Sequence, residues 1–365
     1  MKINKSGASY SSIVKISELI KKTEKETGIK FLTTQRGIND VVGINLDKIK
    51  DLINFNSKEY QIYSPNKGSE ALRKNITLEY FPNHPEYFNY TTICAGGMNA
   101  LDILFQTIST KTIYFNNFSW GSYYKISKIR NKDYSFYNTL DDIDISKLNE
   151  EICIVICDPA NPTGIKVNDD YLKIKIKEIT DTGAIIIIDS PYRKLFYNDN
   201  FFEEIMCPNL ILCESFSKWI GLPGSRISFI TSLNEELNEE LNIRLLYELN
   251  SVSSPSQILV NTILSTPQGK KAIKDFQEET VEHIYNNIEF LRQNNLLVDE
   301  IYNGEDPMGI FAIINKSEDF LFQHRIGAVG LDKFVYHEKD NWSSYSRICV
   351  SVRHELFVEF MKNII

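Results

Sequence analysis

Short runs of apolar residues recur between residues 90 and 230, and they constrain the fold more than any other feature of the chain. The clearest run is four consecutive isoleucines at 185–188. Because these runs lack the alternation of apolar and polar residues that a half-exposed strand shows, we expect strands buried on both faces of a mostly parallel sheet. The predicted strands are 92–95, 112–115, 134–137, 152–157, 184–189, 210–213 and 227–230, with connecting helices at 99–109 and 169–182. The pattern predicts an α/β core.

The sequence changes in character after about residue 270. It predicts one long helix with a polar face at 271–294, strands near 309–314 and 346–351, and a final helix at 355–365. A chain of 365 residues also exceeds the usual size of one domain. We therefore expect a large domain at 46–265 and a smaller α+β domain at 266–365. Residues 1–45 have weak periodicity and would form an N-terminal arm or join the small domain.

Composition and charge favour a small molecule as the ligand. The formal charge of −8 disfavours a nucleic acid or an anionic membrane as the main partner. No run approaches the ~18 apolar residues of a membrane span, and the N-terminus lacks the apolar region of a signal peptide. The cysteines show no CxxC spacing, so we expect buried free thiols, no metal site and a cytoplasmic protein. They are Cys94, Cys153, Cys157, Cys207, Cys213 and Cys349.

Polar side chains follow two of the predicted strands, where open α/β sheets bind their ligands. Asp189 ends the isoleucine run, and Lys218 follows the strand at 210–213. A buried carboxylate needs a cation or a strong donor, and a protonated pyridine nitrogen would serve. A lysine amine becomes a nucleophile toward an aldehyde when burial or nearby positive charge lowers its pKa. Taken singly, Asp189 could cap a helix and Lys218 could be a solvated lysine, so their context has to decide.

A second group of residues is suited to an anion such as phosphate. Ser215, Ser217 and Arg226 flank Lys218 in the sequence, and a guanidinium can bind two oxygen atoms at once. The glycine pair at 96–97 joins a predicted strand to a helix, where free backbone amides bind phosphate. This turn matches neither GxGxxG nor GxxxxGK[ST], so a Rossmann dinucleotide site or a P-loop is not predicted.

Five ordered motifs resemble the class I and II aminotransferases of the pyridoxal-phosphate fold type I, in particular the aspartate aminotransferase type. The likeness runs from about residue 60 to 351 and implies that family's large domain and smaller α+β C-terminal domain. Its motifs are Tyr63-Ser-Pro-Asn-Lys-Gly68 with Leu72-Arg73, Asp158-Pro-Ala-Asn161-Pro-Thr-Gly164, Asp189-x-x-Tyr192, Ser215-x-x-Lys218 followed by Arg226, and Ser346-Arg347-Ile-Cys-Val-Ser351.

The resemblance implies that pyridoxal 5′-phosphate is bound to Lys218 as a Schiff base. Lys218 would also move protons between the substrate α-carbon and the cofactor as general acid and base. Asp189 would keep the pyridine nitrogen protonated, and Asn161 and Tyr192 would hydrogen-bond the phenolate oxygen. The cofactor phosphate would be held by Gly97, Met98, Asn99, Ser215, Ser217 and Arg226.

The resemblance also implies a homodimer with active sites at the interface. Tyr63 would reach the cofactor phosphate of the neighbouring subunit. Trp120, in the segment 117–121, would stack on the cofactor ring, although an aromatic residue in a loop can also belong to the core or the surface.

The substrate site rests on fewer residues. Arg347 would bind the substrate α-carboxylate through two parallel hydrogen bonds, whereas Arg353 is expected to be exposed. Asn161 and Gly37 would contact the substrate as well. Arg36, beside Gly37, is either a substrate contact or a solvated arginine. No second arginine for an acidic side chain is evident, and Phe118 and the pair 190–191 depart from the family pattern.

Several types of reaction use the same set of cofactor-binding residues. Transfer of an amino group from an L-amino acid to a 2-oxo acid by a ping-pong mechanism is favoured, because Arg347 would orient the α-proton for removal. An amino-acid lyase, decarboxylase or oxidase on the same fold is the alternative. A cofactor-binding regulator or silent scaffold is a third class. It is disfavoured by Lys218 and Asp189, and by the lack of a basic helix-turn-helix segment before residue 45.

Overall fold

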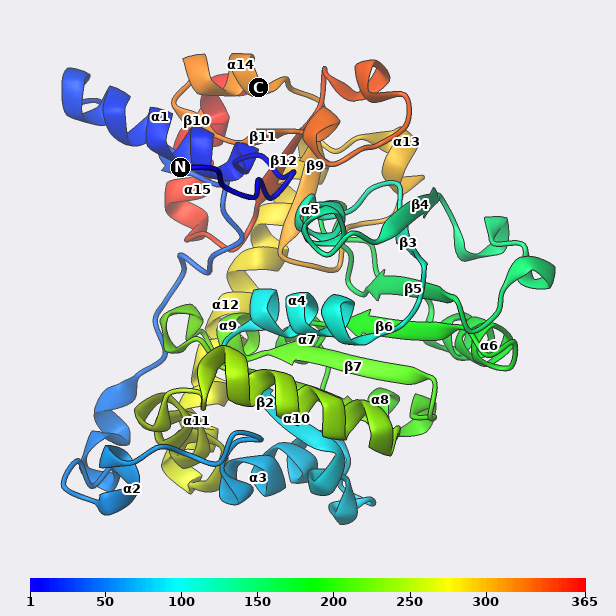
Figure 1. The fold of residues 1–365 in the computed structure, drawn as a ribbon. Coiled ribbons are helices and arrows are strands. Elements are labelled where there is room, and N and C mark those ends of the chain that lie inside the picture. The colour runs from blue at the N-terminus through cyan, green and yellow to red at the C-terminus, as the bar shows by residue number, and fades with distance from the viewer.

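A seven-stranded sheet forms the centre of the computed structural model, which describes residues 1–365 (Figure 1). Its strand order is β2-β8-β7-β6-β5-β3-β4. Only β8 runs antiparallel to its neighbours, so the sheet is mostly parallel and the predicted α/β core is confirmed. The strands are β2 (Thr91–Cys94), β3 (Thr112–Asn116), β4 (Asp133–Tyr137), β5 (Ile152–Cys157), β6 (Ile185–Asp189), β7 (Leu210–Ser215) and β8 (Ser228–Ser232).

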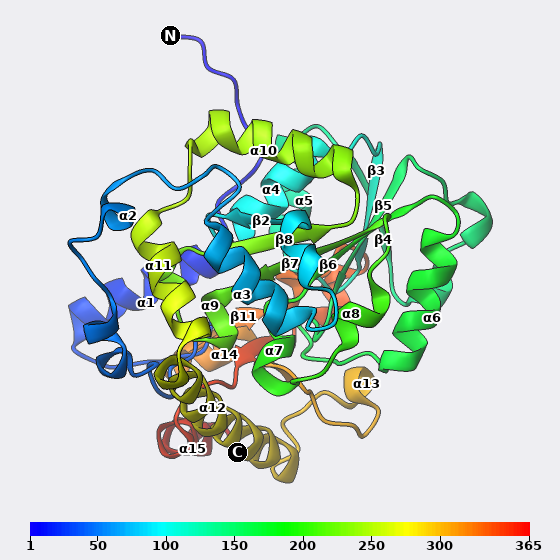
Figure 2. The same cartoon turned by 90° about the horizontal axis from the view of Figure 1, so that it is seen from below.

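Helices cover both faces of this sheet (Figure 2). One face carries α4 (Gly97–Thr107), α5 (Ser122–Ile129) and α10 (Glu235–Leu249). The other carries α3 (Glu70–Tyr80), α6 (Asp169–Thr180), α7 (Arg193–Phe196), α8 (Phe201–Ile205), α9 (Phe216–Trp219), α11 (Ser254–Ser265) and part of α12 (Pro267–Gln293).

The isoleucine run explains why neither face can be exposed. Ile186 and Ile188 pack in one hydrophobic cluster, and Ile187 between them packs in the other. Side chains of a strand point alternately to opposite faces, so a run without polar residues must be covered on both sides. The prediction of strands buried on both faces is confirmed for β6 and its neighbour β7, whereas β4, at the edge of the sheet, is only partly buried.

The C-terminal part contains a smaller, antiparallel sheet. Its strand order is β11-β12-β9, and α12, α13 (Asp299–Tyr302), α14 (Glu318–Gln323) and α15 (His354–Met361) accompany it. The strands are β9 (Phe311–Ile314), β11 (Val329–Gly330) and β12 (Ser346–Cys349). Thr266 caps α12 through a hydrogen bond from the Gly269 amide, so the long helix begins four residues before the predicted start. The predicted last helix ends at Met361 and is followed by a 3-10 turn.

The N-terminal segment joins the C-terminal part. β1 (Leu32–Thr33) pairs with β10 (Ile326–Gly327), and Asp40 forms a β-bridge with Val352. The first 61 residues contain two helices that the sequence analysis did not predict, α1 (Ser12–Thr27) and the short α2 (Lys58–Gln61), and further unpredicted helices such as α3, α10 and α11 follow along the chain. In α1 only Ile16 and Ile20 are buried, which is a weak apolar signal in a largely polar stretch. The proposed domain limits near residues 45 and 265 stay a prediction.

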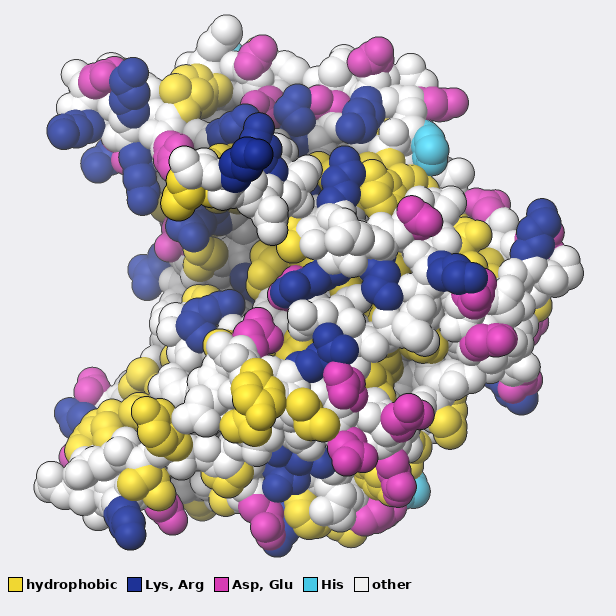
Figure 3. All heavy atoms as spheres, viewed as in Figure 1, with side chains coloured by type: hydrophobic (Ala, Val, Ile, Leu, Met, Phe, Trp, Pro, Cys, Tyr) yellow, Lys and Arg dark blue, Asp and Glu magenta, His cyan; other side chains and the backbone are white.

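The molecule is hollowed on one side. Figure 3 shows the hollow between the part that contains α1 and α15 and the part that contains α2 and α11. None of the helices is both long enough and apolar enough to cross a lipid bilayer.

Candidate active site

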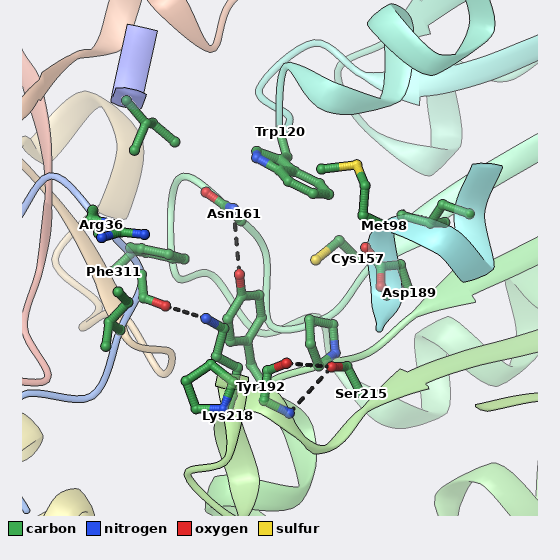
Figure 4. Close-up of a pocket in the computed structure, with 18 of the residues that line it drawn as sticks. Arg36, Met98, Trp120, Cys157, Asn161, Asp189, Tyr192, Ser215, Lys218 and Phe311 are labelled. Atoms are coloured by element: carbon green, nitrogen blue, oxygen red, sulfur yellow. Dashed lines mark hydrogen bonds between the residues drawn. The ribbon is translucent and has the colours of Figure 1, made fainter. Parts of the chain in front are cut away.

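A cavity of about 410 Å³ lies where β5, β6 and β7 end, beside residues of the N-terminal segment and of the C-terminal sheet (Figure 4). Most of the residues that the sequence predicted for the site line it together. They are Gly37, Gly97, Met98, Trp120, Asn161, Asp189, Tyr192, Ser215, Ser217, Lys218, Arg226 and Arg347. Parallel strands open their carboxyl ends at one edge of a sheet, which is why residues far apart in sequence meet there.

Asp189 is a buried carboxylate without a counter-ion. It ends β6, it is only 6% exposed, and no lysine or arginine forms an ion pair with it. Burial raises its pKa to about 6, although a hydrogen bond from the Tyr123 hydroxyl, 2.5 Å from Oδ2, opposes the rise. A carboxylate held in this way would gain from a cationic ligand.

Lys218 is a partly buried amine with a lowered pKa. It lies on α9, the short helix that directly follows β7. Burial lowers its pKa to about 8, and the positive charges of Arg347, Arg226 and Arg36 add to this effect. Its Nζ donates a hydrogen bond to the Gly37 carbonyl oxygen. Near neutral pH such an amine is closer to its nucleophilic, uncharged form than an exposed lysine is.

Asn161 connects Tyr192 with Arg347. Its Nδ2 lies 3.4 Å from the Tyr192 hydroxyl, and its Oδ1 accepts a hydrogen bond from Arg347 Nη1 at 3.2 Å. Burial raises the pKa of Tyr192 well above its usual range and lowers that of Arg347 to about 10. The tyrosine is therefore a neutral donor, and the arginine stays charged at physiological pH.

Arg347 is fully buried yet paired with no carboxylate. Its guanidinium stacks on the rings of Phe311 and Phe334, 4.3 and 4.7 Å from their centroids, and its Nη2 donates to the Gln35 carbonyl oxygen. Its Nε has no hydrogen-bond partner. A buried cation is costly without an anion, so this site fits an anionic ligand.

At the other end of the cavity, the N-terminus of α4 provides groups that can bind an anion. Gly96, which precedes this helix, has φ +87°, and a Cβ there would lie 2.2 Å from the Arg226 guanidinium. The first amides of a helix lack an intrahelical acceptor and can bind an anion. Ser215 Oγ and Ser217 Oγ lie 2.8 Å apart beside them. Amides, hydroxyls and a guanidinium thus converge on one place.

Asn99 and Tyr63 do not line the cavity, unlike the other residues that the sequence predicted. The Asn99 side chain caps its own turn by accepting from the Ala95 amide, and its backbone amide donates to Gly96. Tyr63 is 79% exposed on the loop after α2. Its assignment to the site of a neighbouring subunit stays a prediction.

Several lining residues were not predicted. They include Tyr123, Cys157 and Phe311, and also Ile13, Ile38, Leu101, Pro191 and Pro223. Tyr123 lies three residues after Trp120, and the two rings pack edge to face at 5.7 Å. Trp120 lies before α5 and Tyr123 in its first turn, so no helical spacing in the sequence linked the two, and Ile13 belongs to the helix α1 that the sequence analysis missed.

Arg353 is exposed as the sequence predicted, and the choice that the sequence left open for Arg36 stays open. Arg353 is exposed and donates to the Val41 carbonyl oxygen. Arg36 is exposed but lines the cavity. No group of three or more His, Cys, Asp or Glu side chains is arranged to share a metal ion.

Comparisons with known proteins agree on one family. The model of the family described as aminotransferase class I and II matches residues 39–359. The histidinol-phosphate aminotransferase of Clostridium botulinum (strain Kyoto / Type A2) is 26% identical over 324 residues, covering 82% of this chain and 83% of that protein.

Solved structures show the same fold. An aminotransferase from Mycobacterium tuberculosis matches with a TM-score of 0.83 at 14% identity, over 100% of this chain and 98% of that one. A double mutant of Thermus thermophilus aspartate aminotransferase matches with a TM-score of 0.81 at 15% identity, over 100% and 99% of the two chains. Because the family model covers most of the chain, this protein belongs to the class I and II aminotransferases.

Proposed function

We propose that this aminotransferase binds pyridoxal 5′-phosphate in the cavity and moves the amino group of an L-amino acid to a 2-oxo acid by a ping-pong mechanism. The observation that carries the proposal is that Lys218 and Asp189 face one cavity, each without a charged partner and with pKa values shifted toward neutrality. This pair is suited to an aldehyde and to a basic ring nitrogen.

The residues present fit the cofactor group by group. The α4 N-terminus, Ser215, Ser217 and Arg226 would hold the phosphate. Asp189 would pair with the pyridine nitrogen, and the buried, hydrogen-bonded Tyr192 and Asn161 would face the phenolic oxygen. Trp120, which lines the cavity, would cover the ring. Lys218 Nζ would attach the aldehyde carbon.

The chain's own residues would then direct the reaction. When bound, the cofactor supplies an electron sink that stabilises negative charge at the substrate α-carbon. Lys218 would take the proton from that α-carbon and deliver it to the cofactor within the same half-reaction, and would carry a proton in the opposite direction in the second half-reaction. Arg347 binds the α-carboxylate and so fixes which bond at the α-carbon is broken. Buried side chains around Tyr192 and Phe311 exclude water from this place.

The nature of the amino donor is a further part of the proposal. The curated relatives are named histidinol-phosphate aminotransferases. At 26% identity this name makes histidinol phosphate one candidate donor for the present chain. A guanidinium such as Arg347 can pair with a phosphate as well as with a carboxylate, so the site admits either.

We further propose that the protein works as a homodimer in the cytoplasm. The support for the dimer is a set of apolar side chains that are exposed in the single chain. They are Leu52 (47%), Phe55 (56%), Ile62 (49%), Tyr63 (79%) and, on α10, Tyr247 (85%). Large exposed apolar groups on one chain favour association with a second one. The six cysteines are all free, as thiols of a reducing compartment are.

The test combines spectroscopy with a single half-reaction. Purified protein loaded with pyridoxal phosphate should show the cofactor's visible absorption band, and an amino donor should convert it to the pyridoxamine form with release of the matching 2-oxo acid. Lys218→Ala should lose covalent attachment, and its half-reaction should slow by about three orders of magnitude or more, because the general acid and base is removed.

Two results would contradict the proposal. A band that is unchanged in Lys218→Ala would remove the assigned attachment point. Release of ammonia, carbon dioxide or peroxide in place of the 2-oxo acid would select a lyase, decarboxylase or oxidase.

A further inference from the structure

One cation of the cavity has no partner under the proposed function. Arg36, Lys218, Arg226 and Arg347 line the cavity, against the single carboxylate of Asp189. The proposed function assigns Lys218 and Arg226 to the cofactor and Arg347 to the α-carboxylate of the donor. The Arg36 guanidinium forms no hydrogen bond or ion pair within the chain, and Figure 4 shows it beside Phe311, at the end of the pocket away from Asp189.

The backbone on both sides of Arg36 is held by the residues that do the chemistry. The Gln35 carbonyl oxygen accepts a hydrogen bond from Arg347, and the Gly37 carbonyl oxygen accepts one from Lys218. Lys218 would give up its contact when it holds the cofactor, but the Arg347 contact would remain, so the base of the Arg36 side chain stays fixed beside Arg347 while its guanidinium is free for a ligand. A surface arginine in a loop has no such anchoring.

The space next to Gly37 is also closely defined. A Cβ on this glycine would lie 2.5 Å from the Phe311 ring, so the segment passes directly over the aromatic ring that packs on Arg347. Arg36 thus extends from a tightly packed segment, residues 35–37, which borders the cavity. A ligand held by Arg347 would lie beside this segment.

We propose that Arg36 binds a second negative charge on the amino donor, in addition to the charge that Arg347 binds. The inference rests on the proposed function and specifies its substrate class as doubly anionic amino donors. The planar guanidinium would donate two parallel hydrogen bonds to the anion. Two groups carry this chemistry: the distal carboxylate of a dicarboxylic amino acid, and the second charge of a phosphate monoester.

The experiment compares pairs of donors that differ by about one negative charge, in single half-reactions of the loaded enzyme. Glutamate is paired with glutamine, which has the same α-carboxylate. Histidinol phosphate, which has a phosphate ester in place of the α-carboxylate, is paired with histidine. For Arg36→Gln we expect the half-saturating concentration of the doubly charged donor to rise about 10- to 100-fold, because a charge-assisted hydrogen bond is lost. The singly charged donors should change less than about threefold. Arg36→Lys should lie between, since it keeps the charge but loses the planar fork.

A binding measurement independent of turnover completes the test. Calorimetry of the loaded protein compares glutarate with its monoamide. Arg36→Gln should bind glutarate more weakly than the wild type does, with no such loss for the monoamide. Lys30→Gln is the control. The substitution removes one positive charge from the same N-terminal segment, but the Lys30 side chain is 82% exposed and does not line the cavity.

The outcomes separate this inference from the proposed function. Equal losses for both members of each pair, or an effect of Lys30→Gln as large as that of Arg36→Gln, would overturn the role of Arg36. The pair that shows the loss identifies the anion as carboxylate or phosphate. A wild-type protein that reacts with no amino donor at all would contradict the proposed function instead.

Discussion

Asp189 and Lys218 are shifted in opposite directions by one physical cause. Burial disfavours charge on either group, so it raises the pKa of the acid to about 6 and lowers that of the amine to about 8. Neither group has an oppositely charged partner in the chain. Burial of these two groups therefore costs folding free energy, which a cofactor with a basic nitrogen and an aldehyde would recover.

Replacement of Asp189 by asparagine should make the cofactor-free protein more stable at neutral pH. In the folded chain Asp189 keeps its proton up to about pH 6, whereas in the unfolded chain it loses it near the ordinary value of 3.8. Raising the pH through this window therefore destabilises the wild type relative to Asp189→Asn, by up to about 3 kcal/mol above pH 6. Urea unfolding of both proteins at several values between pH 4 and 7 measures the growing difference.

The control for this prediction is Asp170→Asn on the outer surface of α6, where the side chain is 91% exposed. The same unfolding series on Asp170→Asn measures the effect of replacing a carboxyl group that is not buried. A difference between Asp189→Asn and the wild type that stays constant from pH 4 to 7 would show that the buried carboxyl is ionised in the folded chain at pH 4.

Most of the cavity lining could be predicted at the level of single residues, because the chemistry of Lys218, Asp189 and Arg347 depends on residue type and strand position. Tyr123 could not, since its hydrogen bond to Asp189 depends on how α5 packs on the sheet. Asn99 does not line the cavity, and its assignment to the cofactor phosphate stays a prediction. It follows the correct glycine turn, but one residue of rotation along α4 directs its side chain back to the Ala95 amide.

At the scale of elements, the junction between β2 and α4 is where backbone geometry decides the site. Gly96 has φ +87° and ψ 158°, a conformation that only glycine adopts readily, and it lies against the Arg226 guanidinium. The missing side chain lets the helix N-terminus and the arginine face the same anion.

Gly96→Ala should weaken cofactor binding without unfolding the protein. The strained backbone costs about 1–3 kcal/mol, and the guanidinium has to move away from the added methyl group. We expect the dissociation constant for pyridoxal phosphate to rise about tenfold or more, measured by titration of the cofactor-free protein. Gly224→Ala in the neighbouring loop is the matched control, because a Cβ there has no atom within 4 Å. Equal binding by the two variants would contradict the proposed phosphate site.

Elements with a continuous apolar run or a clear helical spacing of apolar residues were predictable, such as β6 and α12, whereas those with few buried residues were not. The run at 185–188 leaves a buried parallel strand as the simplest solution. The antiparallel direction of β8 depends on its pairing with the preceding strand β7 and with β2, which is distant in sequence, and no local pattern encodes the pairing with β2. The helix α1 has only two buried residues, so its order comes from packing beside β10 and β11.

At the scale of the whole molecule, several apolar side chains are exposed to solvent, and the fold of a single chain gives no reason for this exposure. Tyr63 is an example, because it is 79% exposed although its motif is among those that carry the family resemblance. The cavity of one chain contains no tyrosine from this loop. Both facts are accounted for if Tyr63 completes the site of a second subunit, which a single sequence can imply only through resemblance.

Mixed dimers should test this directly. Tyr63→Ala and Lys218→Ala homodimers should each be nearly inactive, the first because the cofactor phosphate loses a hydrogen bond and the second because the attachment point is gone. If Tyr63 acts across the interface, a hybrid dimer contains one intact site, formed by Lys218 of one subunit and Tyr63 of the other. Co-refolding equal amounts should then restore about a quarter of wild-type activity, since half of randomly formed dimers are hybrids with one of two sites working. If Tyr63 acts within its own chain, every site in the hybrid lacks one of the two residues, and activity should stay at the level of the parent variants.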